Sequence, residues 1–129
     1  MLVWVFKSMT TILMIDDDEL LLELYSAALS DNFHVLFART VAEAIELLAT
    51  EKIDAVGCDY HLSNDELGLD VIAWISTHCT DLLAKTMLIS GELSPPMQGF
   101  NVQCLYKPVA IGELLGVFHA WSTTTEELK

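Results

Sequence analysis

Short apolar runs alternate with segments of helical spacing along most of the chain. The apolar runs predict strands over Thr11–Ile15, Val35–Ala38, Ile53–Cys58, Met87–Ile89 and Val102–Tyr106. Between them, apolar residues recur every three or four positions, which is the spacing of one face of an α-helix. These segments predict helices over Glu19–Leu29, Leu67–His78 and about Ala110–Trp121. A capping box at Thr40–Glu43 predicts one more helix, which extends to about Ala49. Such alternation of strand and helix is typical of a parallel sheet.

The expected fold class is α/β, a five-stranded, doubly wound parallel sheet of the flavodoxin-like kind with helices on both faces. The strands are apolar at nearly every position, which indicates burial on both faces of the sheet. A chain of 129 residues is close to the usual size of one domain, and no repeat or linker divides it. We expect this domain to span residues 11–122, with a leader or an extra strand at 1–10 and a polar tail at 123–129.

Composition limits the partners more than it limits the fold. Six Lys and Arg stand against nineteen Asp and Glu, which gives a formal net charge of −13 at pH 7. A chain without a basic stripe cannot neutralise a phosphate backbone, so we expect no direct binding of nucleic acid. No apolar run approaches the roughly eighteen residues of a membrane span. Three cysteines without paired spacing favour a reducing compartment, and we expect a cytoplasmic protein.

Polar side chains follow four of the predicted strands at the point where each strand ends. Asp16, Asp17 and Asp18 follow the first strand, Asp59 the third, Ser90 the fourth and Lys107 the fifth. The carboxyl ends of parallel strands lie at one edge of the sheet, where ligands of open α/β folds bind. We therefore expect these side chains to converge on one pocket.

The three consecutive aspartates repel one another at the end of a buried strand, and this repulsion favours a bound cation. Mg²⁺ is the simplest occupant, because it is bound through one or two carboxylates together with water and phosphate oxygens. The alternative is that Asp16, Asp17 and Asp18 only cap the following helix, although one aspartate is enough for a cap.

The same pocket has the groups that phosphoryl transfer requires. A carboxylate can act as a nucleophile toward phosphorus. A metal ion and the ammonium of Lys107 would neutralise the charge of the transferring group, and Ser90 could donate a hydrogen bond to one of its oxygens.

Four segments resemble the receiver domain of two-component response regulators, the CheY-like family. They are Ile15–Glu19 (IDDDE), Asp54–Asp59 (DAVGCD), Leu88–Gly91 (LISG) and Leu105–Pro108 (LYKP). The resemblance extends from Thr11 to about Trp121. It implies a signalling domain that takes a phosphoryl group from the phosphohistidine of a histidine kinase or a histidine phosphotransfer protein, with Mg²⁺ as cofactor.

The resemblance also implies roles for particular residues. Asp59 would be the phosphoacceptor. Mg²⁺ would be bound by Asp17 directly, by Asp16 largely through water, by Asp59, and by the backbone carbonyl of His61. The side chain of His61 either tunes hydrolysis of the acyl phosphate or is simply an exposed loop histidine.

A second group of residues would form the switch. Ser90 would move toward the phosphoryl group, with Lys107 as its ionic partner, whereas Asp18 falls outside the family's acidic pair and is expected to cap the helix. Gly91, Glu92 and Cys104 are candidates for tuning the site.

The chain also departs from the family pattern. The loop Tyr60–Glu66 lacks the proline that receivers usually carry there, so we expect an altered loop around an intact site. Few residues separate Ser90 from Lys107, and they include Ser94–Pro96 and Gly99, which predict a fourth helix reduced to a turn or a short stub. Cys104 occupies the position of the family's switch aromatic, and we expect Tyr106 to point to the other face of the strand.

Several functions remain open at this stage. The leading one is a phosphoacceptor switch of a two-component or phosphorelay system, either a stand-alone receiver or a piece of a longer chain such as a hybrid histidine kinase. We expect it not to be an enzyme beyond its own phosphorylation and dephosphorylation. It would act on an effector in trans and could form a homodimer. The alternatives are a degenerate receiver that only binds partners, and a small phosphohydrolase of the haloacid dehalogenase kind that would use Asp16 and Asp18. The cognate kinase, the output and the role of residues 1–8 stay undetermined.

Overall fold

The computed structural model describes residues 9–122, so the predictions for most of the leader and for the polar tail lie outside it. It contains one parallel sheet with the strand order β2-β1-β3-β4-β5. The strands are β1 (Thr11–Ile15), β2 (His34–Ala38), β3 (Ala55–Asp59), β4 (Thr86–Ser90) and β5 (Gln103–Tyr106), and the helices are α1 (Glu19–Leu29), α2 (Val41–Thr50), α3 (Gly68–His78), the 3₁₀ helix η1 (Thr80–Lys85) and α4 (Ile111–Ser122). The predicted fold class is confirmed.

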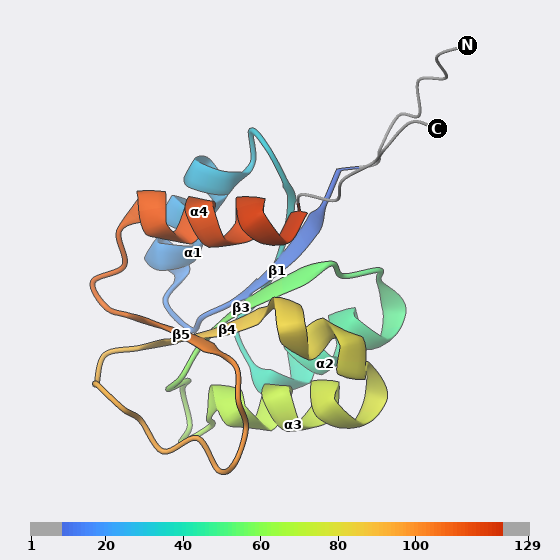
Figure 1. Cartoon of the computed structure of the whole chain (residues 1–129), viewed down its shortest axis with the longest axis vertical. Coiled ribbons are helices and arrows are strands. Elements are labelled where there is room, and N and C mark those ends of the chain that lie inside the picture. Colours follow the sequence, from blue (N-terminus) through green and yellow to red (C-terminus); the bar gives the residue numbers. More distant parts are fainter. Residues whose placement is uncertain (1–8, 123–129) are drawn as a thin grey trace.

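Helices cover both faces of the sheet. The pair α1 and α4 packs on one face, and the pair α2 and α3 packs on the other (Figure 1). Central strand β3 is buried throughout, and its side chains alternate between two cores. Val56 and Cys58 belong to the core beneath α2 and α3, whereas Ala55 belongs to the core beneath α1 and α4. Within the described range, no helix is long and apolar enough to cross a membrane.

Most predicted elements are present, with shifts at their ends. The bounds of β1 and α1 agree with the prediction, but β3 begins two residues later than predicted and includes Asp59. The helix η1 was not expected. The Thr40 hydroxyl accepts a hydrogen bond from the backbone N–H of Glu43 at 3.1 Å, as a capping box requires. The Glu43 carboxylate, however, accepts from the N–H of Arg39 at 2.9 Å rather than from that of Thr40, so the predicted box is only half formed.

The segment between β4 and β5 has no helix. Residues 91–102 form bends and a turn, which confirms the prediction of a shortened fourth helix. Pro95 and Pro96 cannot donate the backbone hydrogen bonds of a helix. Gln98 and Gly99 have φ values of 52° and 85°, which lie in the left-handed region and are incompatible with a right-handed helix.

A glycine at the start of α3 lets that helix approach the end of β3. A methyl group built on Gly68 would collide with the backbone carbonyl oxygen of Asp59 and would lie 2.9 Å from Cys58 Sγ. The backbone N–H of Gly68 also donates to the carbonyl of Tyr60 at 2.8 Å. The close contact between Gly68 and the end of β3 therefore holds the backbone of Asp59 in place.

Gly68→Ala should lower the free energy of unfolding by about 1–3 kcal/mol, because a backbone oxygen cannot rotate out of the way. The matched control is Gly116→Ala in α4, where nothing lies within 4 Å of the added methyl group. That change should raise the free energy of unfolding by about 0.5–1 kcal/mol through helix propensity. Urea denaturation of both variants makes the comparison, and equal effects at the two glycines would contradict the tight packing at Gly68.

Candidate functional site

The strand ends bring the predicted site residues together at one edge of the sheet. Ile15 of β1 pairs with Cys58 of β3, so Asp16 and Asp17 follow β1 beside the end of β3. Asp59 pairs with Ile89 of β4, and Ser90 pairs with Tyr106 of β5, the residue before Lys107. A further backbone bond, from the N–H of Lys107 to the carbonyl of Ser90 at 2.8 Å, continues this register beyond β5.

Asp59 and Lys107 form an ion pair at the centre of the site. Lys107 Nζ lies 3.0 Å from Asp59 Oδ1, and only 7% of the Asp59 side chain is exposed. Burial raises the pKa of Asp59, and the lysine opposes this shift without cancelling it. Burial alone would lower the pKa of Lys107, but its hydrogen bond to Asp59 and the negative charges of the nearby carboxylates together outweigh that effect and raise the pKa. The pair therefore keeps a proton on Lys107 next to a partly desolvated carboxylate.

Two more carboxylates, those of Asp16 and Asp17, lie beside this pair. Asp16, Asp17 and Asp59 each offer one oxygen, and these oxygens lie within 4.8 Å of one another. Asp16 is only 2% exposed, and its Oδ1 accepts the backbone N–H of Asp18 at 2.9 Å. Its other oxygen, Oδ2, is buried and has no hydrogen-bond partner among residues 9–122. Burial is the main cause that raises the pKa of Asp16 to about 6, and the nearby charge of Asp59 adds to it.

Asp18 lies outside this acidic cluster and caps a helix. It is exposed, and its Oδ1 accepts the backbone N–H groups of Leu20 and Leu21 at 3.0 and 3.3 Å. It is therefore the N-cap of α1, as predicted. The alternative that all three aspartates serve only as caps is wrong, because Asp16 and Asp17 have other contacts.

The hydroxyl of Ser90 is buried and is bonded within its own turn. It donates to the backbone carbonyl of Glu92 at 3.0 Å and accepts the N–H of Glu92 at 3.1 Å. The carboxylate of Glu92 in turn lies 3.2 Å from Nε2 of His61, whose side chain is largely exposed. Two of the predicted tuning residues, Gly91 and Glu92, thus directly follow Ser90, and the backbone of Glu92 bonds to its hydroxyl.

Cys104 does not take part in this cluster. It pairs with Leu88 in the sheet, and its thiol lies 3.9 Å from the sulfur of Met97, within the core beneath α2 and α3. The expectation that Tyr106 points to the opposite face is wrong, because residues two positions apart in a strand share a face. Tyr106 is 42% exposed at the end of β5.

The loop after β3 connects the site to the segment that replaces the fourth helix. The hydroxyl of Tyr60 donates to the backbone carbonyl of Pro96. The N–H of Leu62 donates to the carbonyl of Glu66 at 2.9 Å. This bond closes the loop next to the antiparallel bridge between His61 and Leu67. None of the loop's backbone bonds uses the carbonyl of His61, so this oxygen is available as a ligand.

Two contacts at the site were missed in the sequence. The hydroxyl of Ser63 donates to Asp17 Oδ2 at 2.6 Å. The guanidinium of Arg39 donates to the backbone carbonyl of Asp17 at 3.2 Å. Arg39 directly follows β2, so the rule that collected the other strand-end residues could have found it. The contact of Ser63 depends on the path of a loop and had no sequence signal.

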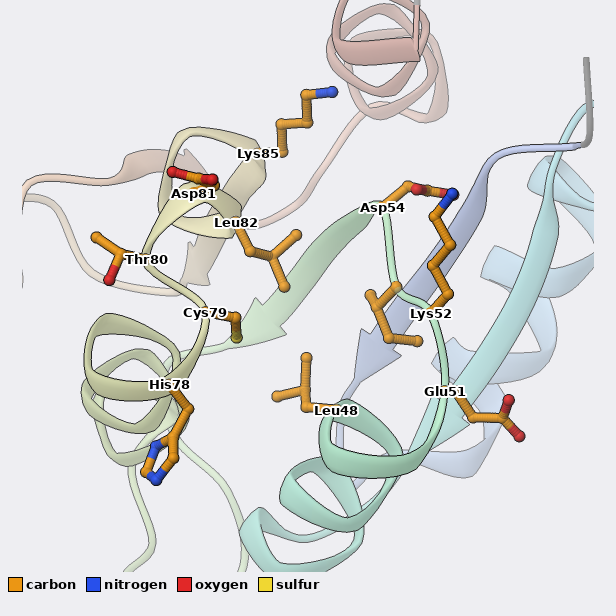
Figure 2. A pocket seen from close by; sticks show the side chains of 11 residues that line it. Leu48, Glu51, Lys52, Asp54, His78, Cys79, Thr80, Asp81, Leu82 and Lys85 are labelled. Atoms are coloured by element: carbon orange, nitrogen blue, oxygen red, sulfur yellow. The ribbon is translucent and has the colours of Figure 1, made fainter.

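Two hollows lie near the sheet edges. One has a volume of about 740 Å³ and lies at the end of β3 that is remote from Asp59. It is lined by the end of α2, by Asp54 and by the residues where α3 meets η1. Figure 2 shows its lining, in which Glu51, Asp54 and Asp81 are mixed with Lys52 and Lys85, so that neither sign of charge dominates. The other, of about 540 Å³, is an apolar groove along α1 that reaches Lys107 and Pro108.

Comparison with known proteins gives one family. Residues 11–91 match the family described as the cyclic-phosphate processing receiver domain. No curated protein matches the chain. Among solved structures, the chain is similar to the signal receiver domain of an HD domain-containing protein from Pseudomonas fluorescens Pf-5, with 25% identity, a TM-score of 0.76, and coverage of 88% of this chain and 94% of that one.

Two further structures support the same fold. A response regulator receiver protein from Sinorhizobium medicae WSM419 has the same identity, coverage and TM-score. A CheY-like receiver domain from Methanospirillum hungatei JF-1 has 21% identity, a TM-score of 0.79, and coverage of 88% of this chain and 93% of that one. The family match covers more than half of the chain, and it agrees with the fold and with the strand-end cluster. The chain therefore belongs to the cyclic-phosphate processing receiver domain family.

Proposed function

We propose that the chain is a phosphoacceptor switch that receives a phosphoryl group on Asp59. The observation that carries the proposal is the position of the Asp59 carboxylate, which lies 3.0 Å from the Lys107 ammonium and beside two more carboxylates at the end of the central strand. A buried carboxylate that is held by a lysine and surrounded by like charges is suited to phosphoryl transfer rather than to stabilising the fold.

The reaction is a single displacement at phosphorus. An oxygen of Asp59 attacks the phosphorus of a phosphohistidine, an O–P bond forms, and the P–N bond breaks. The electron pair of the broken bond stays on the imidazole of the donor, which then takes a proton from solvent. Lys107 remains protonated beside Asp59 and stabilises the negative charge on the transferring oxygens.

The residues present fit a bound Mg²⁺. Asp16 has a buried oxygen without a partner, Asp17 and Asp59 each place an oxygen nearby, and the His61 carbonyl is available. All four are the hard oxygen ligands that Mg²⁺ prefers. When bound, the ion would neutralise charge on the phosphoryl oxygens.

The switch is assigned to Ser90. Its hydroxyl now bonds to the backbone of Glu92, and in the phosphorylated state it exchanges this partner for a phosphoryl oxygen. The exchange would release the turn at Glu92 and the segment 91–102 that follows it. The donor is a histidine kinase or a histidine phosphotransfer protein, and the effector is a protein in trans.

The family description mentions cyclic phosphates, which raises the question of catalysis by this chain. We assign it no enzymatic role beyond its own phosphorylation and dephosphorylation. A phosphohydrolase of the haloacid dehalogenase kind would need Asp18 as a catalytic group, but both hydrogen bonds of that carboxylate cap α1. A degenerate receiver, which binds partners without phosphorylation, is the outcome that a negative labelling experiment would favour.

Asp16→Asn should stabilise the metal-free protein at neutral pH. Asp16 ionises near pH 3.8 in the unfolded chain and near pH 6 in the folded one, so above about pH 6 the folded state carries the full penalty of the buried charge. This difference in pKa between the folded and unfolded chain corresponds to at most about 3 kcal/mol of the free energy of unfolding. Below pH 3.8 the carboxyl is protonated in both states and the penalty is absent.

The measurement is urea unfolding of both proteins without Mg²⁺, at about pH 7.5 and about pH 4.5. The gain from Asp16→Asn should be large at the higher pH and much smaller at the lower one. Asp18→Asn is the control, because asparagine also caps helices, and it should change the free energy of unfolding by less than about 1 kcal/mol. A gain that is the same at both pH values would contradict the buried, ionised Asp16.

Phosphorylation itself is tested with acetyl phosphate, a small phosphoryl donor. We expect the intact mass of the wild-type protein to increase by one phosphoryl group in the presence of Mg²⁺ and not in the presence of EDTA. Asp59→Asn should abolish the gain, because an amide cannot form the acyl phosphate. Asp18→Asn keeps the cap of α1 and should be labelled like the wild type. Labelling of Asp59→Asn at the full level would show that Asp59 is not the acceptor.

A further inference from the structure

The hydroxyl of Ser63 makes the shortest hydrogen bond to any carboxylate of the site. Ser63 Oγ donates to Asp17 Oδ2 at 2.6 Å, across 46 positions of the chain. This distance is typical of a hydroxyl that donates to an ionised carboxylate, which is among the stronger hydrogen bonds in proteins. We propose that Ser63 is a positioning residue that holds Asp17 in the orientation required for Mg²⁺. The inference rests on the proposed function, because it needs a metal at the acidic cluster.

Backbone contacts hold Ser63 in place independently of its hydroxyl. The carbonyl of Ser63 accepts the N–H of Glu66 at 3.3 Å, and Glu66 also accepts the N–H of Leu62 through its own carbonyl at 2.9 Å. Asn64 and Asp65 have φ values of 61° and 60°, the left-handed conformation that these two residue types tolerate best among non-glycine residues. The loop is thus a closed turn, and Ser63 lies at its tip opposite the end of β1.

A second contact anchors the same turn to the rest of the domain. The carboxylate of Glu66 accepts the backbone N–H of Val41, the first residue of α2, at 3.2 Å. The position of Ser63 is therefore set by the loop and by α2. Loss of the Ser63 hydroxyl would remove one hydrogen bond without releasing the loop.

Each acidic residue of the cluster has one donor of a different kind. Asp16 accepts a backbone N–H, and Asp59 accepts the ammonium of Lys107. Within residues 9–122, the Ser63 hydroxyl is the one hydrogen-bond donor to the Asp17 side chain. A carboxylate has about four lone-pair positions, so a bond at Oδ2 leaves Oδ1 available as a metal ligand. Outer partners of this kind orient a ligand before the metal arrives.

Ser63 lies in the loop Tyr60–Glu66, which contains no proline. The receivers that the chain resembles usually carry a proline in this loop, and proline has no side-chain donor. Asp17 is partly exposed and would otherwise rotate freely between several rotamers. Fixing one rotamer in advance removes an entropic penalty from metal binding and raises the affinity.

The test compares Mg²⁺ affinity among single variants of the whole chain. Thermal unfolding is measured as the MgCl₂ concentration rises, and the dissociation constant follows from the shift of the melting temperature. Ser63→Ala should weaken binding about tenfold, at the lower end of the effect of removing an outer partner of a metal ligand. Its melting temperature without Mg²⁺ should fall by no more than a few degrees, because one hydrogen bond is lost while the loop stays closed. Ser63→Thr, which keeps a hydroxyl, should restore the affinity.

Ser30→Ala is the control, because Ser30 is an exposed serine that follows α1 at the end remote from Asp17. It should leave both the metal-free melting temperature and the affinity unchanged. Equal affinity of Ser63→Ala and wild type would overturn the role of Ser63 and leave the proposed function standing. A Ser63→Thr variant as weak as Ser63→Ala would also overturn it, since the loss would then arise from the loop. A wild-type protein that does not respond to Mg²⁺ would refute the metal site itself.

Discussion

The contact between Lys107 and Asp59 is the interaction on which the site depends. Three carboxylates lie at the ends of two adjacent strands, and their mutual repulsion would be unfavourable without a positive charge at the centre. Lys107 supplies that charge from just after β5, which is separated from β1 by β3 and β4. One ammonium cannot neutralise three carboxylates, so the cluster keeps a net negative charge when all of them are ionised. That charge supports the proposal of a bound metal ion.

Side-chain contacts hold the loops around this centre. Ser63 bonds to Asp17, the Tyr60 hydroxyl bonds to the carbonyl of Pro96, and His61 lies against Glu92. Tyr60 and His61 directly follow Asp59, and both reach the segment 91–102 that replaces the fourth helix. Cys104 packs in the core. Under the proposed function, these loop contacts would connect Asp59 to that segment alongside Ser90.

Much of the fold and of the site could be predicted because both follow from local patterns. Apolar runs gave the strands, and the rule that parallel strands end at one edge brought Asp16, Asp59 and Lys107 together. The position of Ser63 could not be predicted, since it depends on backbone bonds that close a loop without sequence periodicity. Arg39 was missed although it obeys the strand-end rule, because no partner for it was evident in the sequence.

A crystal structure of the chain with Mg²⁺ and beryllium fluoride, which mimics a phosphoryl group on a carboxylate, tests the phosphoacceptor role of Asp59. We expect the analogue on Asp59, with Lys107 and the Ser90 hydroxyl both bonded to its fluorides, and Mg²⁺ among Asp16, Asp17 and Asp59. An empty Asp59, or Ser90 still bonded to Glu92 beside a bound analogue, would contradict this expectation.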